Sequence, residues 1–197
     1  MSLRPKLLFS FALSVALSTV STYALAKNDV VLPASVTHSH EFMESLTIAA
    51  EDGVVDAQIQ LARKYDESFK DVENAFKWYA IAAEQGNSQA QAELGVLYSS
   101  GKLGEKNHAQ AFQWFLKSAQ AGNSLGMDLL ATFYWKGMGT PRNYTESYAW
   151  FSAAVATNSS NEYARNALDE LEKKLGPVHI IEAQKSANEI FNAIKNK

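Results

Sequence analysis

The sequence predicts an all-α fold, a right-handed α-solenoid of antiparallel helix pairs, and three observations predict it. Tryptophans recur 36 residues apart, at Trp78, Trp114 and Trp150. Each has a small residue three positions before it and an aromatic residue directly after it. Eight residues beyond each Trp stands Gly86, Gly122 or Asn158, residue types that accept the left-handed conformation at a helix end. Repetition with this period is the signature of stacked helical repeats.

Each repeat contains two helices. In the first, which we call helix A, small, Leu and Tyr residues stand four positions apart, so they form one apolar face, as in Ala90, Leu94 and Tyr98. The second, helix B, carries the tryptophan, for which we expect a core position. Asn87 and Asn123 are placed to cap the helices that follow the glycines. Small residues on helix B are expected to allow close approach of the helices: Ala82, Ala83, Ser118, Ala119 and Ala154.

The predicted organisation has three parts: a signal peptide (1–26), a linker (27–36) and a solenoid (37–197). The solenoid divides into a cap helix (37–52), repeats over about 53–85, 86–121 and 122–157, and a C-terminal helical cap (158–197) whose last helix is expected near 179–194. The first repeat is three residues shorter than the others. Its loop, residues 66–71, has no glycine, so we expect the first helix pair to be tilted differently.

The N-terminus has the features of a secretory signal. Arg4 and Lys6 precede an uncharged apolar run over 7–20, and Ala24-Leu25-Ala26 is a small-x-small cleavage pattern. Cleavage after Ala26 would make the protein periplasmic or secreted. The alternative is that the segment is kept as a membrane anchor.

The repeat pattern carries a resemblance to a known family. The second repeat reads Ala90, Leu94, Gly95 and Tyr98, then a Gly-rich loop, then Ala111, Trp114 and Phe115. This order resembles the Sel-like repeat (SLR) family, a subclass of tetratricopeptide-like helical repeat proteins. Residues Gly137 to Asn143 of the third repeat are similar to the family's loop. The resemblance implies an α-solenoid that binds a protein or peptide partner and catalyses no reaction.

Composition excludes several classes of function. The chain has 18 Lys and Arg against 21 Asp and Glu, an acidic balance that argues against a nucleic-acid partner. It has no cysteine, which excludes disulfides, thiolate metal sites and cysteine nucleophiles. We expect no metal and no cofactor, because the histidine pair His38 and His40 lacks the further ligands and the spacing of a zinc site.

One motif suggests catalysis. Residues 122–126 match Gly-x-Ser-x-Gly, the nucleophile elbow of serine hydrolases, with Ser124 as the nucleophile. That elbow needs a strand before the serine, whereas a helix is expected there. The segment also duplicates Gly86-Asn87-Ser88, so we interpret it as a turn between helices.

The related tetratricopeptide solenoids line a concave groove with helix A. Transferring that geometry makes the candidate partner-binding residues Arg63, Gln89, Val96, Leu125, Asp128, Thr132 and Trp135. The same alignment puts Ile59 and Ala92 in the groove. Trp135 is off the 36-residue spacing, because Asp66 and Ser99 occupy its equivalents, and it is therefore the best interface anchor. The alternative is that Trp135 only packs under the Gly137 loop.

The sequence therefore predicts an exported, non-enzymatic repeat scaffold that binds a protein or peptide through its concave helix-A surface. One alternative is a periplasmic immunity or inhibitor protein that acts against a toxin enzyme. The other is a serine hydrolase that uses Ser124.

Overall fold

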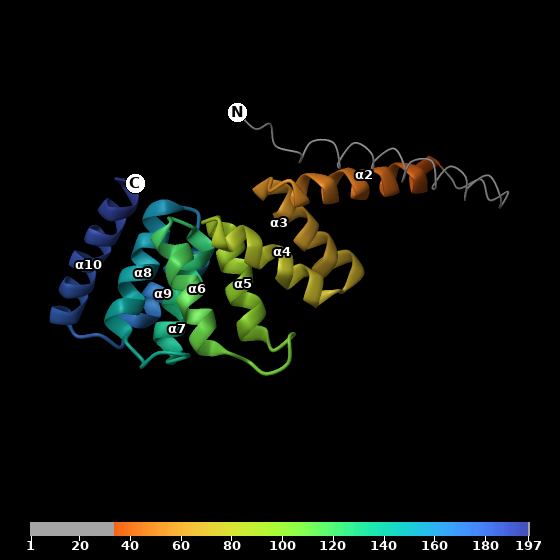
Figure 1. The fold of residues 1–197 in the computed structure, drawn as a ribbon. Coiled ribbons are helices and arrows are strands. Elements are labelled where there is room, and N and C mark those ends of the chain that lie inside the picture. The colour runs from red at the N-terminus through yellow and green to blue at the C-terminus, as the bar shows by residue number, and fades with distance from the viewer. Residues whose placement is uncertain (1–33, 197) are drawn as a thin grey trace, which may run out of the picture. The chain divides into compact units, whose positions relative to one another are not determined.

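The computed structural model describes residues 34–196, with side chains from Glu41 onward. Within this range all regular structure is helical (Figure 1). The chain divides into two units, Met1–Met43 and Glu44–Lys197, and the described part of the first is the beginning of helix α2 (Ala34–Glu51). The predicted signal peptide lies outside the described residues, as does most of the predicted linker.

The helices of the second unit pack in consecutive pairs, which confirms the predicted fold class. They are α3 (Val55–Arg63), η1 (Lys64–Phe69), α4 (Val72–Glu84), α5 (Ser88–Ser100), α6 (His108–Gln120), α7 (Ser124–Lys136), α8 (Tyr144–Thr157), α9 (Glu162–Glu172) and α10 (Pro177–Lys195). α3 pairs with α4, α5 with α6 and α7 with α8, and each pair also packs on the next (Figure 1). Both α9 and α10 pack against α8.

Most of these helices begin at a side-chain cap. An Asn or Asp accepts a hydrogen bond from the backbone N–H three residues ahead, which satisfies a donor that the helix leaves free. The capping residues are Asp71, Asn87, Asn107, Asn123, Asn143 and Asn161. Gly86 and Gly122 have φ of 88° and 87°, as predicted. The prediction for Asn158 is wrong: its backbone is extended, with φ of −132°.

The first repeat has no glycine loop because the chain stays helical there. Residues that were expected to form a loop over 66–71 are largely in the π-helix η1, which continues directly from α3. Lys70 then takes the left-handed conformation, with φ of 56°, that Gly101 takes at the end of α5. The π-helix η1 therefore occupies the place that a loop takes after α5 and α7.

The terminal helices differ slightly from their predicted bounds. α2 begins at Ala34, so the last three residues of the predicted linker, 34–36, are helical, and it ends at Glu51 rather than at 52. α10 runs from Pro177 to Lys195, slightly beyond the expected 179–194. Proline is favoured at the first helical position because it has no N–H to leave unpaired.

The core position of helix B belongs to the aromatic residue after each tryptophan. Phe115 and Phe151 are fully buried and Tyr79 is 3% exposed. Trp78 and Trp150 are also buried, but Trp114 is only half-buried, with the Lys117 ammonium 4.0 Å from its ring centroid. The expectation that Trp114 fills the core is therefore wrong, because its ring lies at the surface of α6 under a lysine.

Small residues allow the helices to approach closely, as predicted. Ser118 is fully buried on α6, and its hydroxyl donates to the carbonyl of Ser88 at 2.7 Å. A Cβ on Gly126 would lie 2.3 Å from the Ser118 oxygen, so α7 can pack here only with glycine at that position. The helix-B alanines are likewise buried: Ala82, Ala83, Ala119 and Ala154.

Candidate functional site

The candidate residues lie on the first helix of each pair. Arg63 is on α3, Gln89 and Val96 are on α5, and Leu125, Asp128, Thr132 and Trp135 are on α7. The four residues on α7 are spaced three or four apart, so they follow one side of the helix. We call the side of α3, α5 and α7 that carries these residues the helix-A face. Two residues that were expected in the groove are not accessible on this face, because Ala92 is fully buried and Ile59 is 5% exposed.

In the third repeat the helix-A face has an exposed apolar end and a buried middle. Leu125 is 45% exposed, whereas the side chains at its equivalent positions are the polar Gln89 and Asp56. Thr132 is 9% exposed, and its hydroxyl donates to the carbonyl of Asp128 at 2.7 Å. Among the α7 residues of the helix-A face, Leu125 is therefore an accessible apolar side chain, whereas Thr132 contributes mainly to packing.

Trp135 lies partly against the core. Its indole meets the ring of Phe151 edge-on, with centroids 6.2 Å apart at 87°, and it is half-buried. Ten residues separate Trp135 from Leu125, about 15 Å along a helix, so the two side chains lie at opposite ends of the stripe. Trp135 thus has a packing role on one edge and an exposed surface on the other.

The sequence reasoning missed the contribution of α9. Asn161, the cap of α9, donates through Nδ2 to both carboxylate oxygens of Asp128, at 3.0 and 2.8 Å. The Tyr163 hydroxyl lies 2.9 Å from Thr132 Oγ1, and its ring is 5.8 Å from that of Phe151. Tyr163 is nevertheless 56% exposed. The only signal in the sequence was the cap itself, since Asn161 precedes its helix as Asn87 and Asn123 do.

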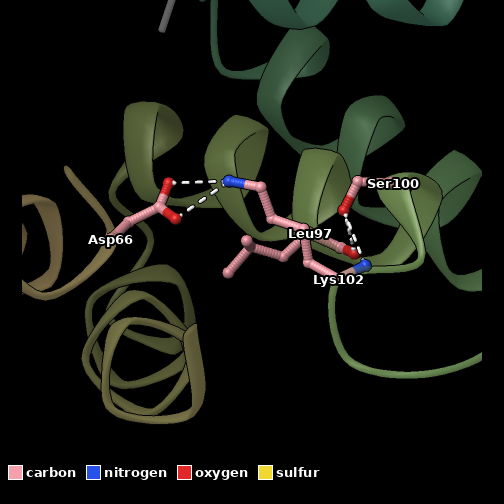
Figure 2. Close-up of polar contacts among 4 residues, drawn as sticks. All are labelled: Asp66, Leu97, Ser100 and Lys102. Atoms are coloured by element: carbon pink, nitrogen blue, oxygen red, sulfur yellow. Dashed lines mark hydrogen bonds and ion pairs between the residues drawn. The ribbon is translucent and has the colours of Figure 1, made fainter. Parts of the chain in front are cut away.

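A second group of polar residues connects the first two repeats. Lys102 donates from Nζ to both oxygens of Asp66, at 2.9 and 3.2 Å (Figure 2). The backbone N–H of Lys102 also donates to the Ser100 hydroxyl, which donates in turn to the carbonyl of Leu97 (Figure 2). The loop after α5 is therefore tied both to its own helix and to η1.

Arg63 lies within this polar group rather than alone. Burial raises the pKa of Glu93, the negative charges of Asp66 and Glu67 raise it further, and the charge of Arg63 opposes the shift. Burial also raises the pKa of Tyr79, whose hydroxyl interacts with Arg63. Arg63 therefore offsets only part of the rise in the pKa of Glu93, a half-buried carboxylate of the neighbouring repeat.

Asp128 has a different electrostatic environment. Burial raises its pKa, and only the hydrogen bond from Asn161 opposes the shift. The ion pairs among the described residues are Lys102–Asp66 and Lys173–Glu170, so no cation pairs with Asp128 there. A half-buried carboxylate without a counter-charge is a feature that a cationic group from outside can stabilise.

Ser124 does not have the geometry of a nucleophile elbow. It is the first residue of α7, and the element before it is the helix α6 rather than a strand. Asn123, between them, caps α7 by accepting from the N–H of Gly126 at 2.9 Å. The Gly-x-Ser-x-Gly segment thus forms a turn between helices, and the strand–turn–helix context of a hydrolase is not met.

No group of three His, Cys, Asp or Glu side chains in residues 41–196 comes together in a way that could hold a metal ion. In the part of the chain that the structure describes, no helix is both long and apolar enough to cross a membrane.

Consecutive helix pairs, glycine turns and a side-chain stripe along the first helices define a protein of the α-helical repeat class. The Sel1 repeat family model matches residues 55–87, 88–123 and 124–156, which together are more than half of the chain. The chain belongs to the Sel1 repeat family. The matched repeats begin two residues later than the predicted boundaries at 53, 86 and 122, because they start after the capping turn.

Solved structures agree with this assignment. A protective antigen of uropathogenic Escherichia coli strains with an SLR fold matches with a TM-score of 0.72 and 28% identity, over 78% of this chain. This chain spans only 34% of that antigen. A Sel1 repeat protein from Oxalobacter formigenes matches with a TM-score of 0.58 and 30% identity, over 65% of this chain and 97% of that one. Comparison with curated proteins gives no significant match.

Proposed function

We propose that the protein is a non-enzymatic scaffold that binds a protein or peptide along its helix-A face. The observation that carries this proposal is the exposure of Leu125, which is 45% accessible at a position where the other repeats have Gln89 and Asp56. The polar residues at the equivalent positions show that the repeat does not require an apolar side chain there. Apolar patches rimmed by polar residues are typical of binding surfaces, and Tyr163, which is 56% exposed, is hydrogen-bonded to Thr132 on the helix that carries Leu125.

Membership of the Sel1 repeat family supports the same proposal. Stacked repeats of this kind form extended surfaces that bind other proteins. A fold does not by itself specify a function, so the identity of the partner has to come from the surface.

The experiment is a pull-down from cell-envelope extract with the full chain, followed by titration of the recovered partner. Leu125→Gln should weaken binding at least tenfold while the melting temperature stays nearly unchanged, because Gln occurs naturally at the equivalent position. Trp135→Ala should weaken binding as well, with some loss of stability from the Phe151 contact. A partner that binds both variants as tightly as the parent would contradict the helix-A face. A toxin enzyme as the partner would instead favour an immunity protein.

The proposal includes export. The basic residues Arg4 and Lys6, the apolar run over 7–20 and the Ala24-Leu25-Ala26 pattern support a cleaved signal, and hence a periplasmic or secreted protein. Fractionation of a cell that expresses the full sequence, with N-terminal sequencing of the product, tests this. A mature chain that begins at Lys27 in the periplasmic fraction supports export. A chain that begins at Met1 in the cytoplasm contradicts it.

A further inference from the structure

Asp128 is out of place in the repeat pattern. The equivalent positions in the other two repeats are Ala92, fully buried, and Ile59, 5% exposed. The fold therefore uses an apolar side chain here, and a carboxylate adds a desolvation penalty. Leu125, one turn earlier, departs from the pattern in the opposite sense, because it is apolar and exposed where the other repeats are polar.

The surroundings of Asp128 are suited to a cation. Asn161 provides neutral N–H donors at 3.0 and 2.8 Å, and no described residue supplies a positive charge within ion-pair distance. Leu125 lies one turn before Asp128 on α7, and the Tyr163 hydroxyl is bonded to Thr132, one turn after it. An exposed aliphatic group and an exposed aromatic ring thus flank the carboxylate. We call Leu125, Asp128 and Tyr163 the Asp128 patch.

We propose that the Asp128 patch binds a lysine or arginine side chain of a peptide or protein partner, whose aliphatic stem packs between Leu125 and Tyr163. The inference rests on the proposed function and specifies the chemistry of the partner. The cation supplies the counter-charge that Asp128 lacks, and the face of an aromatic ring attracts cations as well. Long basic side chains bury their stems on apolar surface while the charged end reaches a polar group. The excess of acidic over basic residues in the chain, 21 to 18, favours the approach of a basic partner.

A purely structural role for Asp128 makes a different prediction. If the carboxylate only holds Asn161, then Asp128→Asn keeps an acceptor oxygen for Nδ2, and the variant should bind any partner as the parent does. If the carboxylate recognises a cation, the same variant should lose affinity although α9 stays in place. The two roles are therefore separated by binding and not by stability.

The probes are peptides of roughly twelve residues, selected from a random display library on the immobilised full chain and then labelled with fluorescein. Each selected peptide is titrated against the parent, Asp128→Asn, Leu125→Gln and the control Asp169→Asn. The control removes an exposed carboxylate on α9 that lies outside the patch. Each peptide is also made with its basic residues replaced, one at a time, by norleucine, which tests the partner even if a protein variant misfolds.

The expected results concern the peptide sequences, the protein variants and the ionic strength. Selected peptides should share a Lys or Arg beside an apolar residue, and Asp128→Asn should weaken them by about tenfold or more, as should norleucine at the shared position. Asp169→Asn should leave the affinity unchanged. The loss should be smaller at high ionic strength, since part of the attraction is then screened.

Other outcomes overturn the inference in distinguishable ways. If Leu125→Gln abolishes binding but the peptides share no basic residue and bind Asp128→Asn equally, the cation site is wrong while the scaffold function stands. If the peptides bind Leu125→Gln as tightly as the parent, the Asp128 patch is wrong. If they also bind Trp135→Ala as tightly as the parent, the proposed function is wrong as well. A concentration-dependent dimer that Leu125→Gln dissociates would assign the patch to a second copy of the chain and overturn the proposal.

Discussion

A Cβ atom built on Gly95 would lie 2.5 Å from Cε1 of Phe115. Phe115 is fully buried on α6, so its ring can move only if neighbouring core side chains also shift. The equivalent positions in the other repeats are Ala62 and Ala131, which carry the Cβ that Gly95 lacks. α5 and α6 are therefore held at a separation that only glycine permits.

Gly95→Ala should destabilise the protein by roughly 1 to 3 kcal/mol, because overpacking outweighs the gain in helix propensity of about 1 kcal/mol. Urea denaturation of the single variant measures the loss. The same substitution in a Phe115→Leu background should cost clearly less, since the smaller side chain leaves room. Equal losses in both backgrounds would show that the contact with Phe115 is not the cause.

The burial of neighbouring helix-B residues predicts which aromatic side chain matters more for stability. Phe115→Ala should reduce the free energy of unfolding by about 3 to 5 kcal/mol, whereas Trp114→Ala should reduce it by about 1 to 2 kcal/mol. Trp114 is half-buried, with the Lys117 ammonium over its ring, so its truncation removes less buried apolar surface. Denaturant melts of both variants test the order. A larger loss for Trp114→Ala would show that Trp114, and not Phe115, is the main core residue of α6.

Repeat one suggests a way to stabilise repeat two. Gln58 donates to the carbonyl of Ala50 at 3.1 Å and accepts from Gln85 at 2.7 Å. Gln91, its equivalent, donates to Ala83 at 3.1 Å, but its Oε1 is buried without a partner. The residue equivalent to Gln85 is Ala121, which is exposed.

Ala121→Gln should therefore stabilise the protein by about 0.5 to 1.5 kcal/mol, because it supplies a donor to the buried oxygen of Gln91. The backbones agree, since Gln85 has φ −75° and ψ 2° and Ala121 has φ −84° and ψ 6°. The gain should disappear when Gln91 is replaced by Met, the residue at 127 in the third repeat. A gain that persists in the Gln91→Met background would have another origin.

The raised pKa of Glu93 predicts that the stability of the protein depends on pH. Burial is the main cause that raises its pKa above the usual 4.5, so the folded state holds the proton more firmly than the unfolded state does. The charged carboxylate therefore lowers stability at neutral pH, and the penalty is relieved as the pH falls through the folded-state pKa. The parent should gain stability relative to Glu93→Gln between pH 7 and about pH 4.5.

Urea denaturation of the parent and Glu93→Gln at both pH values measures this difference. All other titrating groups are common to the two proteins, so their contributions largely cancel. A difference in the free energy of unfolding that does not change with pH, or that changes in favour of Glu93→Gln on acidification, would contradict the raised pKa.

Local features were predictable because they depend on residues close in the sequence. The caps Asn87 and Asn123 and the glycines 86 and 122 act within one turn, so their identity alone indicates where a helix begins or ends. Asn158 shows the limit of this reasoning. A residue type permits a left-handed backbone without requiring it, and the longer connection to α9 leaves Asn158 extended.

The candidate site was predicted only in part. Periodicity placed Leu125 and Asp128 on one side of α7, as they are in the structure. The same alignment predicted that Ala92 and Ile59 line the groove, but both are buried. Aligning one repeat on another identifies equivalent positions. It does not show how much of the side chain at each position is covered by the neighbouring helix. Tyr163 was absent from the predicted surface, because it comes from a helix outside the repeat pattern.

The sequence by itself determined the repeat, the helix pairs and most helix ends, because these follow from the period of apolar residues and from capping chemistry. Only the tertiary structure decided that Phe115 rather than Trp114 fills the core, and that Asn161 approaches Asp128 at 2.8 Å. Both depend on how far a neighbouring helix is displaced and rotated. That displacement results from close packing among residues distant in the sequence, which no local pattern encodes.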